Sequence, residues 1–177
     1  MPSTGVSAMV ASRVGGTDSA TVRSVTSPHE EANLETAAVL TAAAARYTAA
    51  DISGAEFAQQ LLDCLTEDVI FRSTYTPTWE PLRPLFAECR GIDEIVARYD
   101  YENDHEVIHD GSGMPVDVCI AGDVVYYTQR ETASFFDRDP VTWDMVTKIR
   151  FRGGKIAEIN MFVDASPIEA AYGSPPL

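Results

Sequence analysis

Four side chains in this sequence have the types that acid–base chemistry requires. Tyr47 lies four residues before Asp51, one turn of a helix, so both can face the same side of that helix. His109 lies in the segment HEVIHDGSG, and an unperturbed histidine has a pKa close to the neutral pH at which a general base must work. Arg130 lies in the middle of a strand-like segment, where a cation needs a partner.

Each of these residues also has a purely structural interpretation. Arg130 could form a cross-strand pair with a surface carboxylate, Asp51 could cap a helix, and Tyr47 could pack in the core. His109 could be a hydrogen-bonded strand residue, with His105 as the reserve candidate because it lies four residues earlier on the same predicted strand. These alternatives stay open at the level of sequence.

Two aromatic residues and an acidic run complete the candidate set. Tyr75 and Trp79 lie in the loop TYTPTWEPLRP, where they could close a pocket over a planar ligand or bury against the sheet. The alternating acids of the segment DYENDHE, residues 100–106, are interpreted as a solvated face. The three histidines and nearby acids show no recognised metal-ligand spacing, so we expect no metal or other cofactor.

Composition excludes several classes of partner. The net charge of −14 and the pI near 4.4 disfavour binding to nucleic acid and to anionic membranes. No run approaches the roughly 20 apolar residues that a membrane-spanning helix needs, and the N-terminus is a poor signal peptide. Cys64, Cys89 and Cys119 form no CxxC pair and are expected to be reduced and buried, which favours the cytoplasm.

Helices are expected in the first part of the chain. Residues 1–27 lack periodicity and are interpreted as a flexible tail. Ser27-Pro28-His29-Glu30 combines a capping serine, a proline in the first turn and a glutamate three residues after the cap. Ser53 and Glu56 predict a second helix start, and Gly91 opens a third helix that is predicted to end near Tyr101.

Strands are expected in the rest of the chain. Residues 68–73 read as the first strand, and the pattern after His105 is strand-like almost to the end. Apolar and polar residues alternate on both sides of Gly153-Gly154, which predicts a hairpin. One folded domain is therefore predicted over 28–170. The segment IEAAYGSPPL is expected to fray, with 171–177 as a C-terminal tail.

The order of elements and the wording of two segments resemble the nuclear transport factor 2-like superfamily. The segment RYTAADISGAEFAQQLLDCLTEDVIF resembles its opening and GKIAEINMFVDAS its closing strand, and the likeness covers about residues 35–170. The resemblance implies an α+β fold, in which a cone-shaped, curved antiparallel sheet packs on three N-terminal helices and encloses a mainly apolar pocket. It also implies a homodimer. Activity does not follow from this fold, which hosts many chemistries.

Comparison with enzymes of this superfamily gives each candidate residue an expected role. Ketosteroid isomerases place a general base near Ser73 and an oxyanion donor near Thr147. Limonene epoxide hydrolases place acids near Thr132 and Met161, and some SnoaL-like cyclases place one near Met161. None of these four positions is acidic here, so we expect Ser73, Thr132, Thr147 and Met161, with Tyr75 and Trp79, to bind substrate.

The resemblance to scytalone dehydratase is the better match. It implies that His109 is the general base, that Asp51 orients its ring, and that Tyr47 addresses the substrate oxygen. Arg130, which resembles the arginine of limonene epoxide hydrolase, is expected to stabilise a developing oxyanion together with Tyr47. The expected function is therefore a cofactor-independent dehydratase, isomerase or cyclase that acts on a mainly apolar, oxygenated small molecule such as a polyketide- or terpenoid-like intermediate.

Two other functions remain open. One is a non-catalytic binding or assembly module of the same fold. The other is an epoxide hydrolase centred on Arg130, which would require an acid such as Asp144 or Glu131 beside that arginine.

Overall fold

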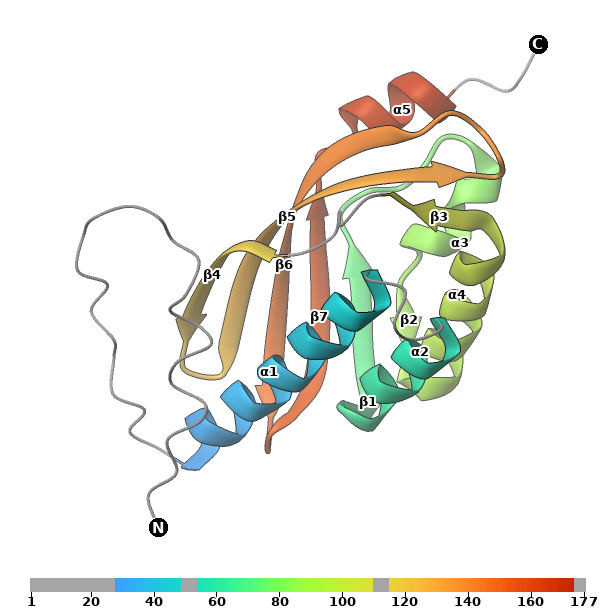
Figure 1. Cartoon of the computed structure of the whole chain (residues 1–177). Helices are drawn as coiled ribbons and strands as arrows, with labels where there is room; N and C mark the ends of the chain where they lie inside the picture. Colours follow the sequence, from blue (N-terminus) through green and yellow to red (C-terminus); the bar gives the residue numbers. More distant parts are fainter. Residues whose placement is uncertain (1–27, 49–53, 110–114, 174–177) are drawn as a thin grey trace, which may run out of the picture.

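The structure, a computed structural model, describes residues 28–48, 54–109 and 115–173. Within these ranges, helices cover one side of a strongly curved sheet (Figure 1). The helical elements are α1 (Pro28–Thr48), α2 (Gly54–Asp63), η1 (Glu80–Leu82), α3 (Arg83–Phe86), α4 (Gly91–His105) and α5 (Ser166–Tyr172).

The seven strands form one sheet in the order β2-β1-β7-β6-β5-β3, with β4 also paired to β5. The strands are β1 (Leu65–Ser73), β2 (Cys89–Arg90), β3 (Glu106–Ile108), β4 (Pro115–Ala121), β5 (Val124–Phe135), β6 (Val141–Arg152) and β7 (Lys155–Val163). The α+β prediction is confirmed, with one correction. The sheet was expected to be antiparallel throughout, but it contains one parallel pair. Strand β7 lies beside β1 and runs in the same direction.

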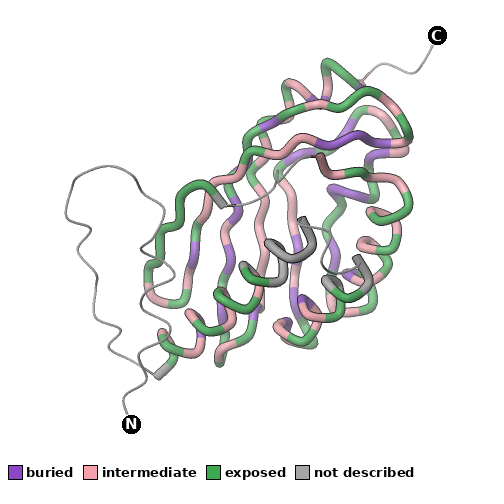
Figure 2. Tube along the Cα trace, viewed as in Figure 1, coloured by how far each residue is buried: buried purple, intermediate pink, exposed green. Residues whose placement is uncertain are grey.

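The two faces of the sheet differ in what covers them. Side chains from α1, α2 and α4, including Leu61 and Ile95, pack with Val69, Phe71 and Ile149 of the strands. We call this covered side the inner face and the opposite side the outer face. Buried and exposed positions alternate along β6 (Figure 2), as period-two patterning requires when only one face is covered.

The start of α1 at Pro28 and the start of α4 at Gly91 confirm the helix predictions, although α4 continues to His105. The hairpin prediction is also confirmed. β6 and β7 pair across Gly153 and Gly154, whose φ angles of 61° and 78° favour glycine. A Cβ atom on Gly154 would lie 3.0 Å from the side chain of Ala32, so α1 packs closely on this turn.

The C-terminal segment does not fray up to residue 173, contrary to expectation. Helix α5 buries Ile168 and Tyr172 in a second hydrophobic cluster with Leu82 and Phe135. Glu169 accepts hydrogen bonds from the Tyr75 hydroxyl at 2.7 Å and from the Thr78 backbone N–H at 2.9 Å. The folded region therefore continues past the predicted boundary at residue 170.

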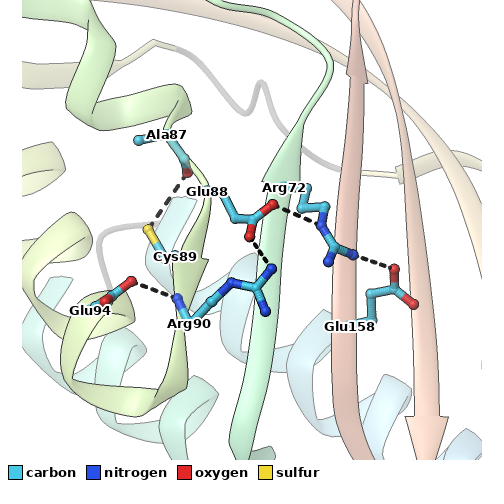
Figure 3. Close-up of polar contacts among 7 residues, drawn as sticks. All are labelled: Arg72, Ala87, Glu88, Cys89, Arg90, Glu94 and Glu158. Carbon is cyan, nitrogen blue, oxygen red and sulfur yellow. Dashed lines mark hydrogen bonds and ion pairs between the residues drawn. The ribbon is translucent and has the colours of Figure 1, made fainter.

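A network of ion pairs crosses the outer face of β1 and its neighbours (Figure 3). Arg72 pairs with Glu88 at 2.9 Å and with Glu158 at 3.0 Å, while Arg90 contacts the other oxygen of Glu88. Arg150 reaches Glu158 from β6 at 3.3 Å. Opposite charges on adjacent strands and on the segment before β2 thus hold the sheet edge together while remaining in contact with water.

Candidate functional site

His109 lies on the outer side of the sheet. Its Nε2 atom is 2.7 Å from the Ser134 hydroxyl, and Ser134 is the register partner of the exposed Val107. Side chains alternate along a strand, so Ser134 and Glu131 project from opposite faces of β5. This hydrogen bond corresponds to the structural alternative for His109 and does not support its role as a base on the inner face.

The remaining members of the predicted histidine site are not brought together with His109. Asp51 lies outside the described residues, as does the side chain of Tyr47, so the expected His109–Asp51 hydrogen bond is untested. The reserve candidate His105 stacks on Phe136 with ring centres 4.6 Å apart and meets Tyr101 edge-on at 4.4 Å.

Arg130 forms an exposed cross-strand ion pair, which corrects the expectation that it stabilises an oxyanion inside the sheet. Its Nε and one terminal nitrogen donate to the two carboxylate oxygens of Asp144 at 2.8 and 2.9 Å. The two side chains are 68% and 59% exposed. Arg130 holds the pKa of Asp144 below its ordinary value, chiefly through the hydrogen bond.

This ion pair lines an open hollow of about 650 Å³ on the outer face, together with apolar side chains such as Val116, Val146 and Phe162. An acid therefore flanks Arg130, as the epoxide hydrolase alternative requires. Asp144 is nevertheless a water-exposed carboxylate with a lowered pKa, which makes it a poor proton donor to an epoxide oxygen. The geometry does not favour that alternative.

Three of the predicted substrate-binding residues share one row on the inner face. Ser73 of β1 is paired with Met161 of β7, and Met161 is paired with Thr147 of β6, which is paired in turn with Tyr127 of β5. Thr132 is different, because it lies on the outer face of β5. Its hydroxyl is 2.8 Å from that of Thr142 on the neighbouring strand.

The two aromatic candidates pack against the protein itself. Tyr75 is buried and meets Phe86 edge-on at 4.8 Å. Trp79 stacks parallel to Tyr172 at 6.0 Å, with the guanidinium of Arg138 5.0 Å from its ring centre. These contacts favour the burial alternative for both residues.

A cluster of four charged residues lies where α4, β3 and β5 meet on the inner face. We call Arg98, Glu102, Glu106 and Glu131 the inner cluster. Arg98 contacts Glu102 one helical turn later at 2.6 Å and donates to the Leu85 carbonyl at 2.8 Å. Its guanidinium also lies 4.4 Å from the ring centre of Phe71. Only 9% of the Arg98 side chain is exposed, so these contacts, and not water, stabilise its positive charge.

The two remaining members of the inner cluster are a hydrogen-bonded carboxyl pair. Glu106 begins β3 directly after α4, and Glu131 lies on β5, where the odd-numbered residues from Val125 to Ala133 face inward. Their side chains are hydrogen-bonded to each other. Two carboxyl groups can share such a bond only when at least one of them carries a proton.

Burial is the main reason that both carboxyl groups hold protons unusually well. It raises the pKa of Glu131 to about 7, with the charge of Glu102 acting in the same direction. It also raises the pKa of Glu106 well above its ordinary value, supported by the charges of Glu102 and Glu131. Arg98 opposes both shifts but is already paired with Glu102. The pair therefore exchanges a proton near neutral pH.

Polar groups of β5 and β6 lie beside the carboxyl pair. The Tyr127 side chain is hydrogen-bonded to Thr147, and Thr147 donates to the Gln129 amide oxygen at 3.3 Å. Burial raises the pKa of Tyr127 to about 12, and the charge of Glu131 adds to that shift. Tyr127 therefore stays protonated and is a hydrogen-bond donor beside the pair.

The sequence interpretation missed this cluster. It assigned Glu102 and Glu106 to a solvated acidic face, which is correct only for the exposed Asp100 and Asp104 of the same run. The available signal was the spacing of Arg98 and Glu102, which predicts an ion pair on α4. A second signal was the alternation of side chains along β5, which places Glu131 on the face opposite to Arg130.

Other expectations concern cysteines, metals and membranes. Cys89 is buried and Cys64 half-buried, but Cys119 is exposed on β4, contrary to the expectation that all three are buried. Within 28–48, 54–109 and 115–173, no group of three or more histidine, cysteine or acidic residues is arranged to hold a metal ion. No helix in those ranges is both long enough and apolar enough to cross a bilayer.

Known proteins resemble this chain in structure and not in sequence. Neither a family model nor a curated protein matches this sequence. Solved structures do match. An NTF2-like protein from Burkholderia xenovorans shares 19% identity at a TM-score of 0.62, over 80% of this chain and 96% of that one.

Two further similar structures are described by an enzyme-like fold or by an enzyme class. A protein with a ketosteroid isomerase-like fold from Catenulispora acidiphila, in complex with trimethylamine, has 17% identity and a TM-score of 0.57 over 80% of this chain and 94% of that one. An LEH-like epoxide hydrolase from M. tuberculosis has 10% identity and a TM-score of 0.55, over 80% and 89%. Identities this low carry the architecture and not the activity. The chain therefore has the nuclear transport factor 2-like fold.

Proposed function

We propose that this protein is a cofactor-independent acid–base enzyme whose proton-transfer groups are Glu106 and Glu131. The observation that carries the proposal is the hydrogen bond between these two carboxyl groups on the inner face, with the pKa of Glu131 raised to about 7. General acids and bases work best when their pKa lies near the operating pH. The pair takes the place of His109, which lies on the other side of the sheet.

The pair supplies both halves of a proton relay. The ionised carboxylate removes a proton from a carbon next to a substrate carbonyl, and the protonated partner donates its own proton to another atom of the substrate. Proton transfer across the hydrogen bond between the two carboxyl groups then restores the starting state. Arg98, held by Glu102, supplies a fixed positive charge beside the pair. Isomerisation, dehydration and cyclisation all use this first proton abstraction, so the same geometry suits each of them.

The surroundings of the pair indicate the class of substrate. The inner face is mainly aliphatic and aromatic, and the hydroxyl and amide groups of Tyr127, Gln129 and Thr147 lie on the same face of β5 and β6 as Glu131. A mainly apolar molecule with one or two oxygen atoms matches this composition. The proposal is supported by one similar structure that is described as an LEH-like epoxide hydrolase and by another that is described as having a ketosteroid isomerase-like fold.

Proton abstraction is tested without knowledge of the natural substrate by following deuterium exchange. The ketone 2-tetralone is incubated with the protein in D₂O, and loss of its α-proton signals is measured by NMR. We expect exchange above the buffer rate, increasing as the pH passes 7 because the base must be ionised. Glu131→Gln should lower the rate by about 100-fold or more, the usual contribution of a general base.

The matched control is Asp144→Asn, which makes the same chemical change on the outer face of the neighbouring strand. It should leave the exchange rate unchanged. Equal rates in wild type and Glu131→Gln would contradict the proposal. Saturable ketone binding without exchange would instead favour the non-catalytic binding module.

A further inference from the structure

Trp143 lies directly across from Glu131, one member of the carboxyl pair, on the neighbouring strand. It lies on β6 as the direct register partner of Glu131 on β5, so the two side chains leave the sheet on the same face. Directly opposed residues of antiparallel strands have Cβ atoms about 5 Å apart. Trp143 is only 3% exposed and packs on Phe135 with ring centres 5.7 Å apart. A buried indole therefore lies beside the proposed base.

The indole N–H of Trp143 has no hydrogen-bond partner among the described residues. Three tyrosines in or against the same hydrophobic cluster differ in this respect. The hydroxyl of Tyr75 donates to Glu169 at 2.7 Å, that of Tyr172 to the Asp139 carbonyl at 2.7 Å, and that of Tyr101 to the Pro81 carbonyl at 2.9 Å. A buried donor without a partner costs free energy and is uncommon in folded proteins.

We infer that Trp143 is a substrate-binding residue whose Nε1–H donates to an oxygen atom of the substrate. The inference rests on the proposed function, because it is the position of Glu131 that makes this donor useful. An indole N–H can only donate, so the bound group must be an acceptor such as a ketone, ester or ether oxygen and not an ammonium.

The arrangement also specifies how the substrate lies. An oxygen held by Trp143 places the neighbouring carbon near the carboxyl group of Glu131 on the next strand. Proton abstraction from that carbon moves negative charge onto the oxygen, where the indole donor stabilises it. The substrate class is accordingly a carbonyl compound with an enolisable C–H bond next to an apolar ring or chain.

The first test is an NMR titration of the intact chain labelled with ¹⁵N in its tryptophans. The sequence has two tryptophans, so two indole signals are expected, and Trp143→Phe assigns them. 2-Tetralone should shift the Trp143 indole proton downfield in a saturable manner. The hydrocarbon tetralin, which has the same rings and no oxygen, should not. Equal effects of the two compounds, or no saturable shift with 2-tetralone up to its solubility limit, would overturn the inference.

The second test uses Trp143→Phe, which keeps an aromatic ring and removes the N–H. Affinity for 2-tetralone should fall about tenfold, the effect of one lost hydrogen bond, while weak tetralin binding stays the same. The unfolding midpoint without ligand should fall only by what the smaller ring costs in core packing, because no hydrogen bond within the described residues is lost. Unchanged 2-tetralone affinity would overturn the inference, and the wild-type titration decides the matter if the variant does not fold.

The two proposals fail in different ways. If Glu131 is not the base, deuterium exchange is absent or independent of Glu131, while the indole shift with 2-tetralone remains. If Trp143 is not the donor, exchange persists and still depends on Glu131, but Trp143→Phe changes neither its KM nor its kcat.

Discussion

Arg130 and Glu131 are neighbours in the sequence and belong to two opposite kinds of charge cluster. Arg130 projects to the outer face and pairs with Asp144 in water, whereas Glu131 projects to the inner face and shares a hydrogen bond with Glu106. The pKa of Asp144 is lowered and that of Glu131 is raised. Two carboxyl groups on adjacent strands, one on each face of the sheet, therefore have pKa shifts of opposite direction.

The cause of this difference is the environment and not the chemistry of the side chains. On the outer face an arginine stabilises the carboxylate and water solvates both partners, so the charged form is favoured. On the inner face burial penalises the charged form, and three carboxyl groups compete for the single cation of Arg98. A curved sheet with one covered face thus produces inert ion pairs and reactive carboxyl groups from alternating residues.

Removal of the arginine should give the largest difference between the two faces. Arg98→Met leaves the half-buried carboxylate of Glu102 without its partner, and we expect a loss of about 2–3 kcal/mol of unfolding free energy. Arg130→Met makes the same change on the outer face and should leave stability essentially unchanged. Urea denaturation measures both. A comparable loss in the two variants would contradict the contrast.

The pH dependence of stability should give the next largest effect. Because the pKa of Glu131 is about 7 in the folded chain and near 4.5 when unfolded, the folded state binds more protons between these values. Stability is therefore highest below about pH 4.5, as far as this group is concerned, and falls as the pH rises through 7. Glu131→Gln should be more stable than wild type by up to about 3 kcal/mol at pH 8, and similar to it at pH 5.

The control for this pH effect is Asp144→Asn, because the contribution of Asp144 to stability changes with pH in the opposite direction. The lowered pKa of Asp144 means that its ion pair contributes above its unfolded pKa and is lost on acidification. The variant should therefore show no gain at pH 8. Denaturation curves of both variants at the two pH values check this, and a Glu131→Gln variant that is destabilised at pH 8 would argue that Glu131 is not buried in its charged form.

Salt should give the smallest effect. Sodium chloride screens exposed charges, so a double-mutant cycle between Arg130 and Asp144 should yield a coupling that vanishes at about 1 M salt. The coupling between Arg98 and Glu102, measured in the same way, should persist because little water or salt reaches that pair. Equal salt sensitivity of the two couplings would remove the distinction between the faces.

The parts of the fold that local patterns encode could be predicted from the sequence. The Gly153-Gly154 hairpin, the start of α1 at Pro28 and the start of α4 at Gly91 each follow from a few neighbouring residues. Helix α5 could not be predicted in this way. It is short, and it is held by distant partners, since Glu169 bonds to Thr78 and Tyr172 packs on Phe135.

The candidate site was less predictable than the fold. Ser73, Thr147 and Met161 lie in one row on the inner face, and this placement follows from strand order and register alone, while their role as substrate-binding residues stays a prediction. Glu106 and Glu131 were missed because their proximity depends on how the end of α4 meets β5, which no local pattern encodes. Arg130 and His109 drew attention by residue type alone, and type does not specify which face a side chain occupies.

The contact between α1 and the last hairpin has a consequence for synthesis of the chain. Thr36 donates to the Gly154 carbonyl at 2.5 Å across 118 positions of sequence, and β1 finds its parallel partner only in β7. Helix α1 and strand β1 therefore leave the ribosome long before the segments that complete them. The apolar surfaces of α1 and β1 therefore stay without their final partners until residue 163 has emerged. During this stage the growing chain is most prone to aggregate and most in need of chaperones.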